Sequence, residues 1–188
     1  MRLIVAITGA TGAPLAVSLL EALNEVGGVE VHLIMSKWAR VTIQTETGRS
    51  ATDLAQLVAH VHSASDQGAS ISSGSFLTDG MVIIPCSMKT LAGIRVGFAD
   101  GLISRAADVI LKEQRKLVLV PRETPLNSIH LENMLALSRM GVSIVPPMPA
   151  YYNHPQTIDD VTDHIVARVL DQFGLRSKRA RRWEGLAT

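Results

Sequence analysis

Residues 1–14 read Met-Arg-Leu-Ile-Val-Ala-Ile-Thr-Gly-Ala-Thr-Gly-Ala-Pro. Leu3–Ile7 is a continuous apolar run, which predicts a strand covered on both faces, as in a parallel sheet between helices. Gly9 and Gly12 then predict a tight turn, and Pro14 suits the first turn of a helix. The unpaired N–H groups at the start of that helix favour an anion, and we expect a phosphate there. An ordinary turn without a ligand is the alternative, because many such turns carry two glycines.

Four more apolar runs follow and alternate with segments whose apolar residues recur every three or four positions. This alternation predicts a single α/β domain, Rossmann- or flavodoxin-like, with a doubly wound, mainly parallel sheet and helices on both faces. The expected strands are Leu3–Ile7, Val31–Met35, Met81–Ile84, Leu117–Val120 and Val142–Val145. The expected helices are Leu15–Asn24, Trp38–Thr45, Thr52–Val61, Met88–Val96, Leu102–Glu113, Ser128–Met140 and Ile158–Phe173.

Composition limits the class of protein. A chain of 188 residues that is 47% hydrophobic can bury one substantial core. A formal net charge of +1 predicts neither a nucleic-acid partner nor an anionic membrane. Cys86 is the single cysteine, so no intramolecular disulfide forms, and the sequence has neither a signal-like segment nor a membrane span. We expect a soluble cytoplasmic protein.

Polar residues follow four of the predicted strands, at Gly9–Gly12, Ser36–Lys37, Ser87–Thr90 and Arg122–Glu123. Carboxyl ends of parallel strands share one edge of the sheet, where ligands of such folds bind. Lys37 stands where an NAD-binding protein places an acidic residue for the ribose, which argues against NAD. Hydroxyls, helix N-termini and cations suit a phosphorylated mononucleotide such as flavin mononucleotide (FMN). Each feature alone is also compatible with ordinary capping or a surface ion pair.

Distinctive motifs are spread over essentially the whole chain. They are Gly-Ala-Thr-Gly, Met-Ser-Lys-Trp-Ala, Thr-Glu-Thr, Ile-Ser-Ser-Gly-Ser-Phe, Pro-Cys-Ser-Met-Lys-Thr-Leu-Ala-Gly-Ile, Arg-Ala-Ala-Asp-Val-Ile-Leu-Lys-Glu, Pro-Arg-Glu-Thr-Pro, Ile-His-Leu-Glu-Asn-Met and Tyr-Tyr-Asn-His-Pro. Together these motifs resemble the UbiX-like flavin prenyltransferases, and most of all the branch associated with phenolic acid decarboxylases.

The resemblance implies a metal-independent transfer of a dimethylallyl group from dimethylallyl monophosphate to N5 and C6 of reduced FMN. The product, prenyl-FMN, would serve a UbiD-type aromatic acid decarboxylase. The resemblance also implies a homo-oligomer, a dodecamer, in which neighbouring subunits complete the sites. Whether the donor is instead the diphosphate stays open.

The resemblance assigns three groups of residues by motif. The implied FMN ligands are Gly9, Ala10, Thr11, Ser36, Ser87, Met88, Lys89, Thr90 and Arg122. The implied ligands of the prenyl phosphate are Tyr152, Arg168, Lys112, Arg105 and Trp183. The implied catalytic residues are Glu46, Glu123, Thr11 and Lys112. Many relatives have serine where this chain has Thr11, which keeps the hydroxyl but adds a methyl group and restricts its rotamers.

The chemistry suits these residue types. Without magnesium, the departing phosphate needs arginine and lysine groups in a dry pocket. Trp183 would face the allylic cation. Glu123 would pass a proton to the phosphate, or form an ion pair with Arg122 or Lys112. Glu46 would act as the general base near flavin N5, or lie in solvent at a helix end.

We expect residues 1–175 to form the FMN-binding domain and the basic tail 176–188 to complete the prenyl site, a solvated tail being the alternative. Phe76 lies where some relatives carry an aromatic lid, in a Ser/Gly-rich segment between His62 and Asp79 that is long for a simple connection. Cys86, which follows a predicted buried strand, is expected to be a core residue.

Other functions remain open. No zinc-like spacing links His60, His62, His130, His154 and His164, so no metal site is expected. FMN-dependent cysteine decarboxylases carry a Pro-x-Met-Asn-x-x-Met-Trp clamp, where this chain has Pro146-Pro-Met-Pro-Ala-Tyr-Tyr152. A decarboxylase subunit acting on phenolic acids and an FMN carrier are further alternatives.

Overall fold

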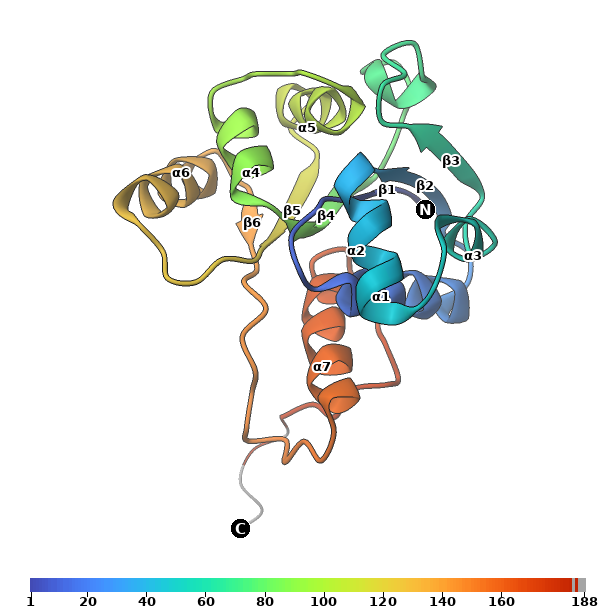
Figure 1. Cartoon of the computed structure of the whole chain (residues 1–188), viewed down its shortest axis with the longest axis vertical. Coiled ribbons are helices and arrows are strands. Elements are labelled where there is room, and N and C mark those ends of the chain that lie inside the picture. The colour runs from blue at the N-terminus through green and yellow to red at the C-terminus, as the bar shows by residue number, and fades with distance from the viewer. Residues whose placement is uncertain (184, 186–188) are drawn as a thin grey trace.

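The computed structural model describes residues 1–183 and residue 185. Its strands form a single parallel sheet in the order β3-β2-β1-β4-β5-β6 (Figure 1). The order reverses between β1 and β4, as in a doubly wound Rossmann-type sheet. This confirms the predicted fold class. The strands are β1 (Arg2–Ile7), β2 (Glu30–Met35), β3 (His60–Ser63), β4 (Gly80–Cys86), β5 (Lys116–Pro121) and β6 (Ser143–Ile144).

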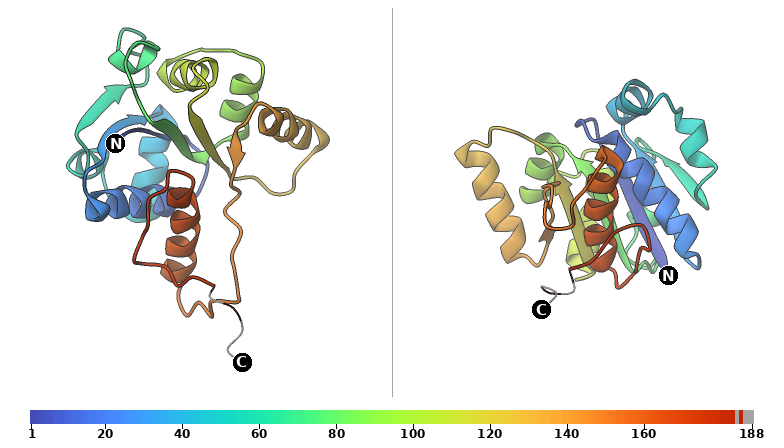
Figure 2. Two further views of the ribbon diagram at one scale, coloured as in Figure 1. Left: turned by 180° about the vertical axis from the view of Figure 1, so that it is seen from behind. Right: turned by 90° about the horizontal axis from the view of Figure 1, so that it is seen from below.

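Helices cover both faces of this sheet (Figures 1 and 2). One layer contains α1 (Ala13–Val26), α2 (Lys37–Thr47), α3 (Ala51–Ala55) and α7 (Ile158–Asp171). The other contains the short 3₁₀ helix η1 (Ser70–Ser72), α4 (Met88–Arg95), α5 (Leu102–Lys112) and α6 (Ser128–Arg139). Among the described residues, no helix combines the length and the apolar character that a membrane crossing requires.

The central strands are buried on both sides, which explains why their sequences are apolar without alternation. In β1, Val5 packs in the core beneath α1 and α7, whereas Ile4 and Ala6 pack in the core beneath α4 and α5. All three side chains are at most 1% exposed. Two cores separated by one sheet are the expected outcome of continuous apolar strands.

The predicted helix Thr52–Val61 is wrong in its second half. A capping box between Ser50 and Asp53 starts α3, but this helix ends at Ala55, and β3 follows at the edge of the sheet. The strand contains mostly exposed polar residues, so it lacks the apolar run by which the other strands were recognised. This segment is a strand because it pairs with β2. Such pairing depends on tertiary context and cannot be read from local sequence propensity.

The long Ser/Gly-rich segment is tied to α5 and to the residues after it. Arg105 on α5 donates to the Ser72 carbonyl at 3.1 Å. Arg115 donates to the carbonyls of Gly74 at 2.7 Å and Phe76 at 3.0 Å. Charge-assisted bonds of this kind give an irregular segment a definite path.

Phe76 does not lie over the carboxyl ends of the strands. Its ring packs 4.5 Å from the Arg2 guanidinium carbon and 5.3 Å from the His32 ring centroid, at the amino ends of β1 and β2. Phe76, the expected aromatic lid residue, therefore packs at the amino ends of the strands, opposite the carboxyl ends where a lid would lie.

Candidate active site

A cavity of about 430 Å³ opens at the carboxyl ends of β1, β2 and β4, where the strand order reverses. This volume lies within the range of about 300–1,000 Å³ typical of small-molecule sites. Five of the predicted FMN ligands line it: Gly9, Ser36, Ser87, Lys89 and Thr90. Residues that are far apart in sequence meet here because parallel strands end at a common edge.

Two helix N-termini border the cavity. Ser36 caps α2 by accepting from the Ala39 N–H at 3.1 Å, and Ser87 caps α4 by accepting from the Thr90 N–H at 3.3 Å. The first turn of a helix carries N–H groups without intrahelical partners and a partial positive charge. Lys37 and Lys89 add ammonium groups to the same lining. The cavity is thus suited to a phosphate.

Thr8 holds the two sides of the strand-order reversal together. Its hydroxyl donates to the Pro85 carbonyl at 2.7 Å and accepts from the Ser87 N–H at 2.8 Å. The side chain is only 2% exposed. One buried hydroxyl therefore joins the end of β1 to the end of β4 and to the cap of α4.

The turn that begins α1 holds an anion from the chain itself. The Glu46 carboxylate, near the end of α2, accepts from the N–H groups of Gly12 at 2.9 Å and Ala13 at 2.8 Å. The sequence predicted a phosphate at the start of this helix, whereas in this structure these two N–H groups bond to a carboxylate. Glu46 is not simply solvated, because this contact fixes it one residue from Thr11.

The four other predicted FMN ligands lie close to the cavity without lining it. Thr11 is exposed and Ala10 is half-buried in the turn between β1 and α1. Met88, in the first turn of α4, packs against the core beneath the helix. Arg122, which follows β5, is exposed, and its N–H donates to the Cys86 carbonyl at 3.2 Å.

Three predicted ligands of the prenyl phosphate gather around α7, away from this cavity. The Tyr152 hydroxyl lies 3.3 Å from His164 Nε2, and the Tyr152 ring packs edge-on against Trp183 at 5.5 Å between centroids. Arg168, one turn after His164, forms an ion pair with Asp171 at 2.7 Å. His164 and Arg168 line a separate groove of about 740 Å³ between α6 and α7.

The chain between β6 and α7 explains this separation. It runs away from the sheet to the end of the molecule where the C-terminal tail also lies, and α7 then returns toward the sheet (Figure 1). Tyr152 belongs to this excursion, so a single chain does not bring it to the carboxyl ends of the strands.

The remaining predicted phosphate ligands also face elsewhere in one chain. Lys112 forms an ion pair with Glu113 at the end of α5. Arg105 pairs with Asp108 at 2.7 Å in addition to its bond to the loop. Glu123 is exposed and accepts from the Thr124 N–H at 3.1 Å, and no ion pair to Arg122 or Lys112 occurs within the described part of the chain.

The basic tail is partly docked rather than solvated. Arg179 pairs with Glu21 and Glu25 on α1, and the hydrogen bond from Arg179 lowers the pKa of Glu25. Arg182 pairs with Asp171 at 2.7 Å, and its hydrogen bond lowers the pKa of that carboxyl group. Four positions of the expected tail, 184 and 186–188, lie outside the described residues.

Cys86 is a core residue. Its side chain is fully buried, and burial raises the pKa of the thiol to about 12. At neutral pH it is a thiol rather than a nucleophilic thiolate, as the sequence predicted.

Sequence reasoning missed several residues that line the cavity. Trp38 follows Ser36 and Lys37 within a motif that the sequence had singled out, so its position was available as a signal. Phe98, Asp100 and Ser104 come from the start of α5 and the loop before it. Because these three residues do not follow a predicted strand, a search for polar residues at strand ends could not find them.

The fold and the cavity are those of a nucleotide-binding α/β protein, with two helix N-termini bordering the cavity. The family model described as Flavoprotein matches residues 1–170. A curated relative from Escherichia coli O157:H7, "Probable UbiX-like flavin prenyltransferase", is 70% identical over 186 residues, covering 99% of this chain and 94% of the relative.

Two solved structures are similar over nearly their whole length. A dodecameric FMN-dependent UbiX-like decarboxylase from Escherichia coli O157:H7 is 70% identical, with a TM-score of 0.97 over 98% of this chain and 100% of the other. AnUbiX (PadA1) in complex with FMN and dimethylallyl pyrophosphate is 52% identical, with a TM-score of 0.97 over 99% of this chain and 98% of the other. The chain belongs to the flavoprotein family and, within it, to the UbiX-like flavin prenyltransferases.

Gly9 provides a test of the cavity. A Cβ atom at this position would lie 2.4 Å from Trp38 Cβ, so Gly9→Ala must displace the start of α2 and with it Ser36 and Lys37. Overpacking of this kind costs about 1–3 kcal/mol. We expect the dissociation constant for FMN, measured by fluorescence titration, to rise about tenfold or more.

The matched control is Gly68→Ala, whose added Cβ would make only an ordinary contact of 3.4 Å with Asp66. This variant should bind FMN as the unsubstituted protein does. Unchanged FMN affinity in Gly9→Ala would place the flavin elsewhere.

Proposed function

We propose that this chain transfers a dimethylallyl group from dimethylallyl monophosphate to N5 and C6 of reduced FMN and supplies the prenyl-FMN product to a UbiD-type aromatic acid decarboxylase. One observation carries the proposal: two capped helix N-termini and two lysines surround a cavity at the strand-order reversal. AnUbiX (PadA1), which has the same fold, is in complex with FMN and dimethylallyl pyrophosphate, which supports this use of the cavity.

FMN is the acceptor in this proposal, and its phosphate is held at the start of α2 and α4. Ser36, Ser87, Lys89 and Thr90 supply hydroxyl and ammonium donors there. Gly9, Ala10, Thr11, Met88 and Arg122 would be the remaining FMN ligands. Glu46, which the first turn of α1 fixes in place, would act near the flavin ring.

The second phosphoester is held by residues from a neighbouring subunit. Within α5, Ser104 lines the cavity but Lys112 lies eight residues further along, about 12 Å at the helical rise per residue. Tyr152, Arg168 and Trp183 gather around α7 rather than at the cavity. These positions support an oligomer whose chains complete one another's sites, and a dodecamer, the state of a 70% identical relative, is the proposed form.

Charge explains how such a site would cleave an allylic C–O bond. Arginine forks of Arg168 and Arg105, the Lys112 ammonium and the Tyr152 hydroxyl would stabilise the departing phosphate, and Glu123 would deliver a proton to it. The Trp183 face would stabilise the allylic cation by about 0.5–2 kcal/mol, too little to replace phosphate activation. Arg168 must exchange its present partner Asp171 for the phosphate.

Glu46 would accept the proton that the flavin ring loses when C6 forms its new bond, with Thr11 beside it. Two backbone N–H groups orient its carboxylate before any substrate arrives. We also propose that residues 176–183 serve the prenyl site through Trp183, and that the protein acts in the cytoplasm.

A decarboxylase or a carrier of FMN is the competing function, and the word decarboxylase in the description of one relative favours testing it. The sequence Pro146-Pro-Met-Pro-Ala-Tyr-Tyr152 lacks the Asn and Trp of the cysteine decarboxylase clamp. Tyr152, the last residue of this sequence, is instead one of the proposed ligands of the prenyl phosphate.

Flavin mass separates these functions. Purified protein incubated without oxygen with reduced FMN and dimethylallyl monophosphate should yield a flavin heavier by one five-carbon unit, measured by mass spectrometry. A parallel reaction with dimethylallyl diphosphate identifies the donor. Flavin of unchanged mass with both donors would contradict prenyl transfer and favour the carrier or the decarboxylase.

Two substitutions of Glu46 separate its chemistry from its contact with α1. Glu46→Gln keeps an oxygen that accepts the same two N–H bonds but cannot take a proton, so turnover should fall by about 100-fold or more at unchanged thermal stability. Glu46→Ala should lose turnover and also about 0.5–2 kcal/mol of unfolding free energy, as other cap losses do. Full turnover in Glu46→Gln would show that Glu46 caps the start of α1 but does not act as a general base.

A further inference from the structure

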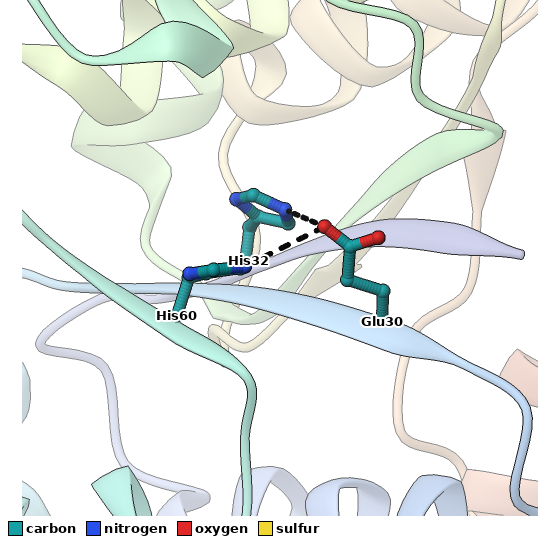
Figure 3. Close-up of side chains that lie close together, drawn as sticks. All are labelled: Glu30, His32 and His60. Carbon is teal, nitrogen blue, oxygen red and sulfur yellow. Dashed lines mark hydrogen bonds and ion pairs between the residues drawn. The ribbon is translucent and has the colours of Figure 1, made fainter.

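Two neighbouring strands place a carboxylate and two imidazoles together at the amino ends of β2 and β3 (Figure 3). Glu30 and His32 are two residues apart on β2 and so share a face of the sheet. His60 is paired with His32 in the parallel register between β2 and β3. This group lies at the end of the strands opposite the flavin cavity, and the proposed reaction does not use it.

The distances match those of a metal site. His32 Nε2 lies 3.0 Å and His60 Nε2 lies 3.5 Å from Glu30 Oε1, and the ligand atoms of all three residues lie within 4.8 Å of one another. Tetrahedral Zn²⁺ with nitrogen and oxygen ligands at about 2.0–2.1 Å separates neighbouring ligand atoms by about 3.3 Å. The side chains therefore need little movement to enclose an ion.

Further contacts orient the two ligands on β2. His32 Nδ1 lies 2.9 Å from His62 Nε2, so an Nδ1–H can donate to His62 while Nε2 is left for a metal. Metal-bound histidines are commonly held by such a second hydrogen bond. Arg2 binds both oxygens of Glu30 at 3.0 Å, and each carboxylate oxygen can still accept a second partner.

The three side chains differ in burial: one is enclosed in the sheet and two are accessible to solvent. His32 is 3% exposed, whereas the side chains of Glu30 and His60 are 37% and 54% exposed. An ion can therefore enter from solvent on the side of Glu30 and His60 and meet a ligand that is already held in the sheet. A site with three protein ligands leaves the fourth tetrahedral position to water.

We propose that Glu30, His32 and His60 bind one divalent transition-metal ion, Zn²⁺ being the ion whose ligands and geometry they match. The bound ion ties the exposed edge strand β3 to β2. Because it binds the folded chain, it should also raise the midpoint of thermal unfolding.

The test titrates tag-free, EDTA-treated protein with Zn²⁺ in competition with a chromogenic chelator. One equivalent should bind, and the zinc X-ray absorption edge of the unsubstituted protein should report two imidazole ligands. A spectrum of oxygen ligands alone would mean adventitious ion only and would overturn the proposal.

Variants locate the ion. His60→Ala removes an exposed ligand and should weaken Zn²⁺ binding at least about tenfold and abolish the thermal shift. His154→Asn is the matched control, because it removes another imidazole and asparagine tolerates the positive φ of 53° at that position. Zn²⁺ binding that is equal in both variants and in the unsubstituted protein would place the ion elsewhere and refute the assignment.

Discussion

The hydroxyl of Thr8 makes the two hydrogen bonds on which the site depends. By joining the Pro85 carbonyl to the Ser87 N–H, it fixes the carboxyl end of β1 against the end of β4 and against the cap of α4. The chain leaves β1 and β4 toward opposite faces of the sheet, into α1 and α4, so a cavity opens between them. The side chains of Ser36 and Ser87 cap the N-termini of α2 and α4, and both N-termini border this cavity.

Helix N-termini largely determine where this fold can hold negatively charged groups. The start of α1 is satisfied by Glu46, whereas the starts of α2 and α4 border the cavity beside Lys37 and Lys89. A carboxylate at one N-terminus and the proposed phosphate at the two others would be consistent uses of the same partial positive charge. Two backbone N–H groups thereby fix Glu46 beside the turn between β1 and α1.

Much of this arrangement could be predicted from the sequence, because apolar runs identify central strands and polar residues after them identify the binding edge. Gly9, Ser36 and Ser87 were found in this way. The capping contact of Glu46 and the strand at His60 could not be, since both depend on pairing between segments far apart in the chain. The proposed roles of Lys112 and Tyr152 depend in addition on how one subunit packs against another, which neither the sequence nor a single chain shows.

In the proposed site two phosphoesters meet at the carboxyl ends of the strands, one held by each of two chains. A crystal structure of the assembly with FMN and dimethylallyl monophosphate would test this arrangement. We expect the FMN phosphate at the starts of α2 and α4 of one chain, and Lys112, Tyr152 and Arg168 of a neighbouring chain on the prenyl phosphate. An FMN phosphate bound at Gly12 and Ala13 with Glu46 displaced, or prenyl-phosphate ligands remote from the flavin in every subunit arrangement, would contradict it.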